Sequence, residues 1–168
     1  LNRIQDGSVV KGDRLDHVSG VTNSDKKLEE IGPAPKFELL NQNNVKITNE
    51  TYKGKVYVLE FFFTTCPTIC PKMNQSMLSI EKKFFGNFLT GDRETIFNLA
   101  NKGFNLYAGE NSKVNGGFEH SGLFALVDKN GVIRCRKDDF GNPILYYDGL
   151  EKIGVRNIQQ DISILLKE

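Results

Sequence analysis

Two cysteines four positions apart, Cys66 and Cys70, are the residues of this sequence whose types and spacing most directly predict chemistry. They follow an apolar run at 56–63, which reads as a strand buried on both faces, and they precede a segment with helical periodicity. Ligands bind where the strands of α/β sheets end, and the free N–H groups of a helix N-terminus favour a thiolate. The position therefore predicts a functional pair of sulfurs.

The spacing of the pair leaves two chemistries open. Cys66 and Cys70 could close a disulfide if their Cβ atoms approach to about 3.5–4.5 Å, and they could equally hold a soft metal ion. Pro67 stiffens the connection between them, and Pro71 suits the first turn of a helix, where an N–H group is not needed. The alternative is a pair of inert, buried cysteines, which the flanking prolines at a strand-to-helix junction disfavour.

Length and composition describe an ordinary globular domain. The chain has 168 residues and a net charge of +1, so no nucleic acid partner or anionic membrane surface is indicated. No apolar run reaches the ~20 residues of a membrane-spanning helix. The sequence begins at Leu1 without Met, and we expect an upstream export signal or anchor to have been removed. Three cysteines are too few for a disulfide scaffold.

The pattern of the chain predicts a polar arm over residues 1–32 and one domain over 33–168. Within the domain we expect first a hairpin (37–40 with 45–47), then two helices (71–85 and 92–103) and then a second hairpin (121–127 with 132–136). A final helix at the C-terminus is expected to carry Ile158, Ile162, Leu165 and Leu166 on one side. Asp92 is the expected N-cap of the second helix, and Gly103 its expected end.

Three further sulfur-containing residues are predicted to be structural. Met73 and Met77 lie at helical spacing, which is typical of a core-facing stripe although thioethers also bind Cu(I). Cys135 shares one face of its strand with Ile133, so it is predicted to be a buried, inert residue.

The topology contains an apparent omission. A buried strand followed by a helix normally returns to a parallel neighbouring strand. Only residues 87–91 separate the first helix from the second, and five residues cannot supply a strand and a crossover. We therefore expect a strand-helix segment to be missing from this sequence near Gly86–Phe88.

His120 is one of two histidines, and it directly precedes a predicted strand, whereas His17 lies in the polar arm. The segment entering this hairpin would pass beside the cysteine loop in a thioredoxin-like sheet, which would bring an imidazole near both sulfurs. A hydrogen-bonded surface histidine is the alternative from position alone.

Three ordered landmarks resemble the Sco/SenC family of copper chaperones. They are a Cys-Pro-x-x-Cys-Pro signature, a segment similar to the family's Asp-His-Ser with the hairpin that follows it, and a stretch ahead of a helix; in this sequence these are 66–71, Glu119-His120-Ser121 with 124–131, and 88–92. Glu119 stands where the family usually has Asp. The family's strand with an Asp-Pro motif, and its following helix, are absent at the place where topology indicates the omission.

The resemblance implies a thioredoxin-like α/β fold, with a central mixed sheet flanked by helices and an N-terminal hairpin extension. It implies that Cys66, Cys70 and His120 bind one copper ion, as Cu(I) or Cu(II), and that Cys66 and Cys70 form a redox-active pair. Family members are membrane-anchored and face the periplasm or another extracytoplasmic space, or the mitochondrial intermembrane space in eukaryotes. They deliver copper to, or reduce thiols of, the dinuclear copper site of cytochrome c oxidase.

Three functions remain open on the sequence. The first is a copper chaperone, which is not an enzyme, and the second is a thiol-disulfide oxidoreductase that acts on partner cysteines without metal. The third is a peroxidase-like thiol enzyme. Simple dithiol exchange gives the distant His120 no required role, which favours the copper chaperone.

Overall fold

The computed structural model describes residues 27–63, 69–81, 87–114 and 117–168. Its main sheet has six strands, β1 (Glu29–Pro33), β4 (Tyr57–Leu59), β8 (Leu123–Val127), β9 (Val132–Lys137), β10 (Pro143–Ile144) and β11 (Tyr147–Asp148). A three-stranded sheet contains β2 (Glu38–Asn41), β3 (Lys46–Thr48) and β5 (Leu89–Thr90), and a two-stranded ribbon contains β6 (Ala108–Glu110) and β7 (Phe118–His120). The helices are η1 (Asn49–Tyr52), α4 (Ile69–Glu81), α5 (Arg93–Asn98), the π-helical segment η2 (Leu99–Phe104) and α6 (Lys152–Leu165).

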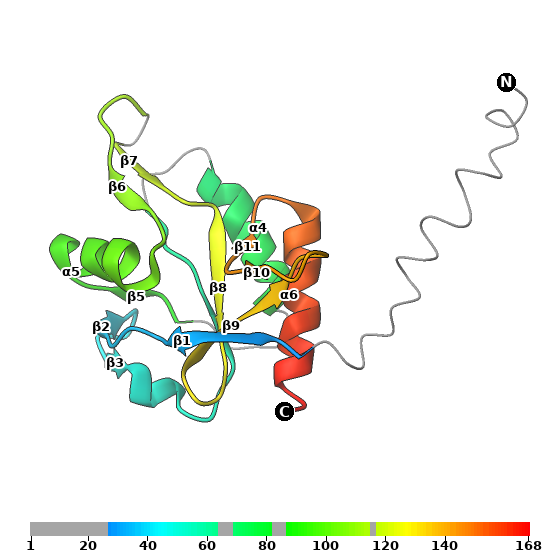
Figure 1. Cartoon of the computed structure of the whole chain (residues 1–168). Coiled ribbons are helices and arrows are strands. Elements are labelled where there is room, and N and C mark those ends of the chain that lie inside the picture. Colours follow the sequence, from blue (N-terminus) through cyan, green and yellow to red (C-terminus); the bar gives the residue numbers. More distant parts are fainter. Residues whose placement is uncertain (1–26, 64–68, 82–86, 115–116) are drawn as a thin grey trace, which may run out of the picture.

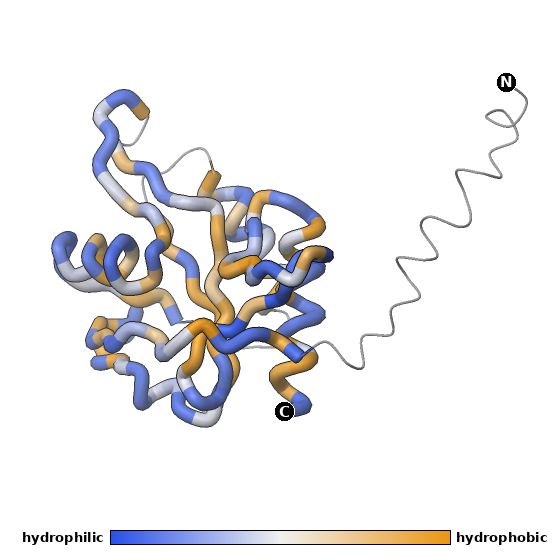
Figure 2. The backbone as a smooth tube through the Cα atoms, in the orientation of Figure 1, coloured by the Kyte–Doolittle hydropathy of each residue, from blue (hydrophilic) through white to orange (hydrophobic). Residues whose placement is uncertain are grey.

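Strand β8 is the centre of the main sheet because it pairs with three others. It is antiparallel to β9, to β4 and to β11, and β9 in turn pairs with β1 and β10. Residues 124–127 of β8 are all completely buried, and Figure 2 shows this hydrophobic segment in the middle of the molecule. A strand buried on both faces requires a layer of structure on each side.

The two faces of β8 pack against different helices, which gives three layers (Figure 1). Phe124 and Leu126 join a cluster with Met73 of α4 and Ile158 of α6. On the other face, the alternate residues of β8 join a cluster that includes Leu99, Ala100 and Phe104 of η2; these strand residues are Ala125 and Val127. The alternation of side chains along a strand thus separates α4 and α6 from α5 and η2.

Both predicted hairpins are present. Leu39 pairs with Ile47 across β2 and β3, and β8 and β9 join through the predicted turn 128–131. The Asp92 side chain caps α5, since its carboxylate accepts a hydrogen bond from the Thr95 N–H group at 2.9 Å. Met73 is fully buried and Met77 packs beside it, so both belong to the core. Cys135 is fully buried as predicted.

Four details differ from the sequence predictions. Only 57–59 of the apolar run form a strand, and these residues are half-buried rather than buried on both faces, because β4 has β8 as its one described neighbour. The second helix ends at Phe104, not Gly103, and its C-cap Asn105 takes the left-handed conformation (φ 53°). Leu166 lies beyond the end of α6 and is exposed. Residues 29–32, assigned to the polar arm, belong to β1 and pair with β9.

The structure shows where the chain goes after α4. In place of a parallel neighbour for β4, residues 89–90 form β5 and pair with β2 in the smaller sheet. Every strand pair in the described ranges is antiparallel, so the parallel return strand that the topology calls for is not among them. The continuity of the chain at Gly86–Asn87 falls on a residue outside those ranges, and the omission stays a prediction.

Candidate functional site

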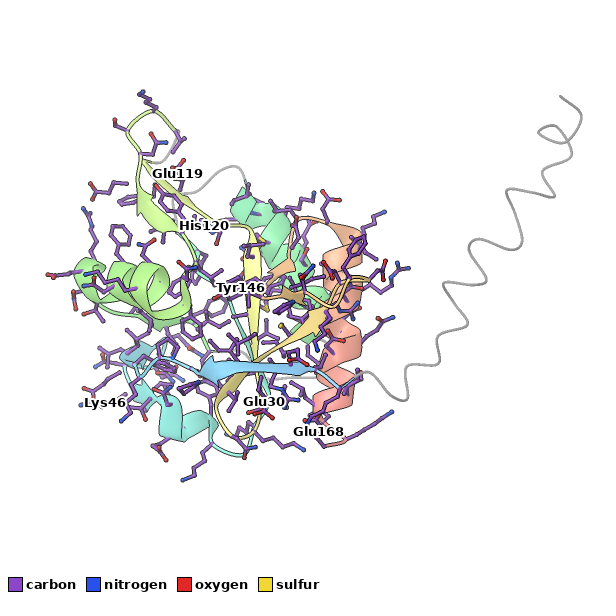
Figure 3. All side chains as sticks on the ribbon, viewed as in Figure 1. Glu30, Lys46, Glu119, His120, Tyr146 and Glu168 are labelled. Atoms are coloured by element: carbon purple, nitrogen blue, oxygen red, sulfur yellow. The ribbon has the colours of Figure 1, made fainter. Side chains whose placement is uncertain are left out.

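The structure brings Cys70 and His120 together, although fifty positions separate them. The Cys70 Sγ atom lies 2.9 Å from His120 Nε2. Cys70 is the second residue of α4, and His120 is the last residue of β7 (Figure 3). Because α4 packs on the Phe124 face of β8, and β8 follows β7 after two residues, the first turn of the helix is held against the end of the ribbon.

The other nitrogen of the imidazole defines its tautomer. His120 Nδ1 lies 3.0 Å from the carbonyl oxygen of Ser121. A carbonyl oxygen only accepts hydrogen bonds, so Nδ1 carries a proton, and in the neutral imidazole Nε2 then presents its lone pair to the Cys70 sulfur. Metal-binding histidines commonly have this arrangement, in which one nitrogen donates to a carbonyl and the other binds the metal.

The pair is enclosed. His120 is 6% exposed and Cys70 is 4% exposed. The Phe63 ring approaches the imidazole edge-on, with the ring centroids 5.6 Å apart. A buried thiol beside a buried nitrogen lone pair can share a proton, or can exchange that proton for a metal ion.

Cys66 lies outside the described residues, so its predicted place beside Cys70 and His120 stays a prediction. His17, the other histidine, also lies outside them. Among the residues that the structure describes, no group of three His, Cys, Asp or Glu side chains could hold a metal ion. The described part of the site thus contributes one sulfur and one nitrogen.

Sequence reasoning missed the groups that surround the imidazole. The Ser121 carbonyl and the Phe63 ring both contact His120, and the Phe118 ring stacks on Phe63. Phe118 could have been found, because it lies two positions before His120 in a strand and so shares its face. The Ser121 carbonyl is a backbone group, and no residue type in the sequence indicates its role.

Glu119, the residue that departs from the family pattern, lies on the opposite face of β7. Its carboxylate accepts hydrogen bonds from the Tyr107 hydroxyl at 3.0 Å and from Asn111 Nδ2 at 2.9 Å. The hydrogen bond to Glu119 raises the pKa of Tyr107 above its ordinary value. Glu119 therefore stabilises the ribbon that carries His120.

These features define a thioredoxin-like α/β domain with a sulfur-nitrogen site at a helix N-terminus, and comparisons with known proteins show which family it is similar to. The SCO1/SenC family model matches residues 25–87. A putative copper-binding protein of Stutzerimonas stutzeri is 39% identical over 62 residues, which are 37% of this chain and 28% of that protein. A SCO2-like protein of Rickettsia typhi is 28% identical over 150 residues, covering 68% of this chain and 73% of that protein. Over these residues the chain is similar to proteins of the Sco/SenC family.

Solved structures agree on the fold. A SCO1/SenC family lipoprotein from Bacillus anthracis superposes with a TM-score of 0.67 at 22% identity, over 83% of this chain and 98% of that chain. Arabidopsis thaliana ScoI with copper bound superposes with a TM-score of 0.56 at 17% identity, over 80% and 98% of the two chains. The thioredoxin-like prediction is confirmed. The alignments span 28% of the Stutzerimonas stutzeri protein and 24% of a SCO1 protein homolog of Bacillus subtilis, so the chain matches about a quarter of the length of these two curated relatives.

Proposed function

We propose that this protein binds copper as a metallochaperone, and that it delivers copper to, or reduces thiols of, the dinuclear copper site of cytochrome c oxidase. The observation that carries the proposal is the 2.9 Å contact between Cys70 Sγ and His120 Nε2. The relatives support it: one is named a putative copper-binding protein, and BsSco, whose structure is solved, is a member of the Sco family of cytochrome c oxidase assembly proteins.

The described donors suit copper as cargo. Thiolate sulfur favours the soft Cu(I) ion, and imidazole nitrogen also suits Cu(II), so a sulfur-nitrogen set can hold either state. His120 Nε2 is already aimed at Cys70 Sγ, because the Ser121 carbonyl holds the proton on Nδ1. We assign Cys66 as the third ligand from the family resemblance. A set of three ligands leaves copper open to ligand exchange with a partner.

The state of the thiols would control binding. Cys70 must lose its proton before its sulfur binds a metal, and Cys66 must do the same. A disulfide between Cys66 and Cys70 removes both thiolates, so oxidation of the pair would stop copper binding and reduction would restore it. In the relative BsSco, a disulfide switch has been identified.

The partner and the location follow from the same proposal. The partner is the copper-site subunit of cytochrome c oxidase, and the protein works outside the cytoplasm, held to a membrane by a segment upstream of this sequence. A SCO1/SenC relative of solved structure is a lipoprotein. None of the helices in the described ranges is long and apolar enough to cross a membrane. Finding the full-length protein in the soluble cytoplasmic fraction would contradict the proposed location.

Copper titration of the reduced protein tests the proposal. Wild type is compared with Cys66→Ser, Cys70→Ser and His120→Ala, and Cys135→Ser serves as the matched cysteine control because Cys135 is buried in β9. We expect one copper per chain in wild type and in the control, with thiolate-to-Cu(II) charge-transfer bands. Each ligand variant should weaken binding by at least tenfold. Unchanged affinity in both Cys66→Ser and Cys70→Ser would rule the site out.

The same contact also favours a second function, thiol-disulfide exchange without metal. His120 Nε2 can accept the Cys70 proton, and a base beside a thiol generates the attacking thiolate. In this reaction a thiolate of the pair attacks a partner disulfide, and the second cysteine closes the Cys66–Cys70 disulfide as two partner thiols are released. This function would be supported if the reduced, metal-free protein reduces a peptide disulfide, with one disulfide reduced per protein molecule. Because the imidazole is the base in this reaction, His120→Ala should slow the metal-free exchange, and an unchanged exchange rate would contradict this second function.

A further inference from the structure

One face of the β6–β7 ribbon carries both His120 and Phe118. These residues are two positions apart in β7, and alternate residues of a strand point to the same face. Their partners across the ribbon are Ala108 and Glu110. Ala108 is small and buried, so the His120 imidazole has room on this face. Glu119 between them points the other way, to Tyr107 and Asn111.

The Phe63 ring joins these two side chains. It stacks on Phe118 with the centroids 4.9 Å apart and the planes 20° from parallel. It also meets His120 edge-on, at 5.6 Å and 62°. Phe97 of α5 adds an edge contact to Phe63 at 6.1 Å. Aromatic pairs at these separations and angles attract each other beyond the burial of their area, so Phe63 transmits the position of Phe118 to the imidazole.

Arg93 fixes the other end of this arrangement. Its guanidinium carbon lies 5.2 Å from the centre of the Phe118 ring, within range of a cation–π interaction. The same guanidinium pairs with Glu110, the cross-strand partner of Phe118. Arg93 is the first residue of α5, where the Asp92 cap orders the helix start. We call this series of stacked side chains, which comprises Arg93, Phe118 and Phe63, the aromatic column. It connects α5 to His120.

We propose that Phe118 is a positioning residue for His120, acting through the aromatic column. The hydrogen bond to the Ser121 carbonyl holds the proton on Nδ1 only while the imidazole keeps this rotamer, and a change of the side-chain torsions would break it. Contact with Phe63 fixes the ring plane, which keeps Nε2 on Cys70 Sγ. Phe63 also lies three residues before Cys66 in the chain, so the column links both chain segments that carry the proposed ligands.

Loss of the Phe118 ring should have two effects. The effect on His120 in the metal-free protein does not depend on copper, whereas the effect on copper affinity rests on the proposed function. Partners that orient a metal-binding histidine commonly contribute 10- to 100-fold to metal affinity. Phe118→Ala should therefore weaken copper binding by about tenfold. In the metal-free protein the same change should release His120 from its single tautomer.

The test uses Phe118→Ala, with Phe118→Tyr as the conservative variant that retains the ring. Phe88→Ala is the matched control, because Phe88 makes a similar edge contact at 5.9 Å to Phe62 but contacts neither Phe63 nor His120 among the described rings. Each variant is made in a His17→Ala background, which leaves His120 as the only histidine. Long-range ¹H–¹⁵N spectra of the neutral imidazole then report the tautomer, and competition with a chelator reports copper affinity.

We expect one tautomer, protonated at Nδ1, in the parent protein, Phe118→Tyr and Phe88→Ala, and a mixture in Phe118→Ala. A single unchanged tautomer in Phe118→Ala would overturn the proposal, whether or not the protein binds copper. If the parent binds no copper, the proposed function fails while the tautomer still tests the positioning role. If Phe118→Ala does not fold, Arg93→Ala replaces it, since Arg93 is largely exposed. Arg93→Ala should shift the tautomer in the same direction, and no shift would overturn the proposal.

Discussion

Cys70 and Cys135 are both buried, but different groups lie beside their sulfur atoms. Cys70 has the His120 nitrogen at 2.9 Å, whereas burial, and next the nearby carboxylate of Glu29, raise the pKa of the Cys135 thiol. A raised pKa lowers the thiolate fraction on which alkylation depends. We therefore expect Cys135 to be alkylated at least tenfold more slowly in the folded, reduced protein than after unfolding, and it should take no part in a disulfide. Rapid labelling of Cys135 in the folded state, measured by peptide mass spectrometry, would contradict its burial.

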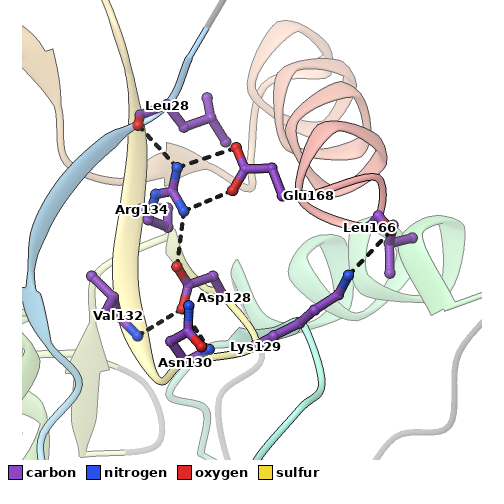
Figure 4. Close-up of polar contacts among 8 residues, drawn as sticks. All are labelled: Leu28, Asp128, Lys129, Asn130, Val132, Arg134, Leu166 and Glu168. Carbon is purple, nitrogen blue, oxygen red and sulfur yellow. Dashed lines mark hydrogen bonds and ion pairs between the residues drawn. The ribbon is translucent and has the colours of Figure 1, made fainter.

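A second pair of residues predicts how stability depends on pH. The Asp128 carboxylate accepts a hydrogen bond from buried Arg134 at 2.8 Å and also receives the Val132 and Asn130 N–H groups of the turn (Figure 4). Burial acts to raise the Asp128 pKa, but these hydrogen bonds outweigh it and the pKa lies below its ordinary value. The carboxylate therefore stabilises the fold above the unfolded pKa of about 3.9, and this contribution is lost as the pH falls through the folded pKa.

Asp128→Asn tests this because an amide can still accept the turn hydrogen bonds without pairing with the Arg134 charge. Glu168 also pairs with Arg134, so we expect a loss of about 1–3 kcal/mol in unfolding free energy at pH 7, rather than the larger loss of an isolated buried charge. The difference from wild type should shrink below about pH 4. Urea unfolding at several pH values measures it, and a difference that stays constant down to pH 3 would contradict the assignment.

At the scale of elements, the first turn of α6 packs against β11 with no space for a side chain. A Cβ atom added to Gly154 would lie 2.0 Å from the Asp148 carbonyl oxygen. Glycine to alanine within a helix usually gains about 1 kcal/mol. Here the clash is with backbone, so we expect Gly154→Ala to lose about 2 kcal/mol or more. Ser163→Ala, at an exposed position of the same helix, should change the urea midpoint very little, and a stabilised Gly154→Ala would show that α6 can move away.

The sequence predicted elements whose signals are local. The two hairpins and the Asp92 cap follow from turn residues and alternation within about ten positions, and all three are present. The sequence did not predict burial that depends on partners distant in the chain. Arg134 alternates with Ile133 and Cys135 along β9 and so lies on the face opposite to theirs, yet it is 3% exposed because Asp128 and Glu168 compensate its charge. The half-burial of β4 was also missed, since burial on both faces needs neighbours that the described chain does not provide.

The candidate site shows the same division. The position of Cys70 at the start of a helix follows from the apolar run and Pro71, which are adjacent in sequence. The approach of His120 to Cys70 depends on how α4, β7 and β8 pack, and before the structure it was indicated by the place of His120 ahead of its hairpin in a thioredoxin-like sheet and by the family resemblance. The tautomer of His120 could not be predicted at all, because it depends on the direction of one backbone carbonyl.

At the scale of the whole molecule, the sheet is arranged around β8, and β4 is left with one described neighbour. The first strand described after α4 is β5, which pairs with β2 in the smaller sheet and not with β4. An unpaired strand edge invites association with other chains, so a domain of this type is expected to cover it. A parallel strand on the free side of β4, followed by a crossover helix, would do so and would complete the mixed sheet that the sequence predicted.

We therefore predict that the natural protein contains about 30 further residues near Gly86–Phe88, the size of a strand-helix return. Peptide mapping of the protein from its source checks this. Trypsin cleaves after Lys83 and Arg93, so a continuous chain yields the peptide Phe84–Arg93 with the sequence printed here. If residues are missing, that peptide is absent while peptides such as 114–129 are found. Recovery of intact Phe84–Arg93 would refute the prediction, and β4 would then have to be stabilised by the half-burial of its own side chains and its pairing with β8 alone.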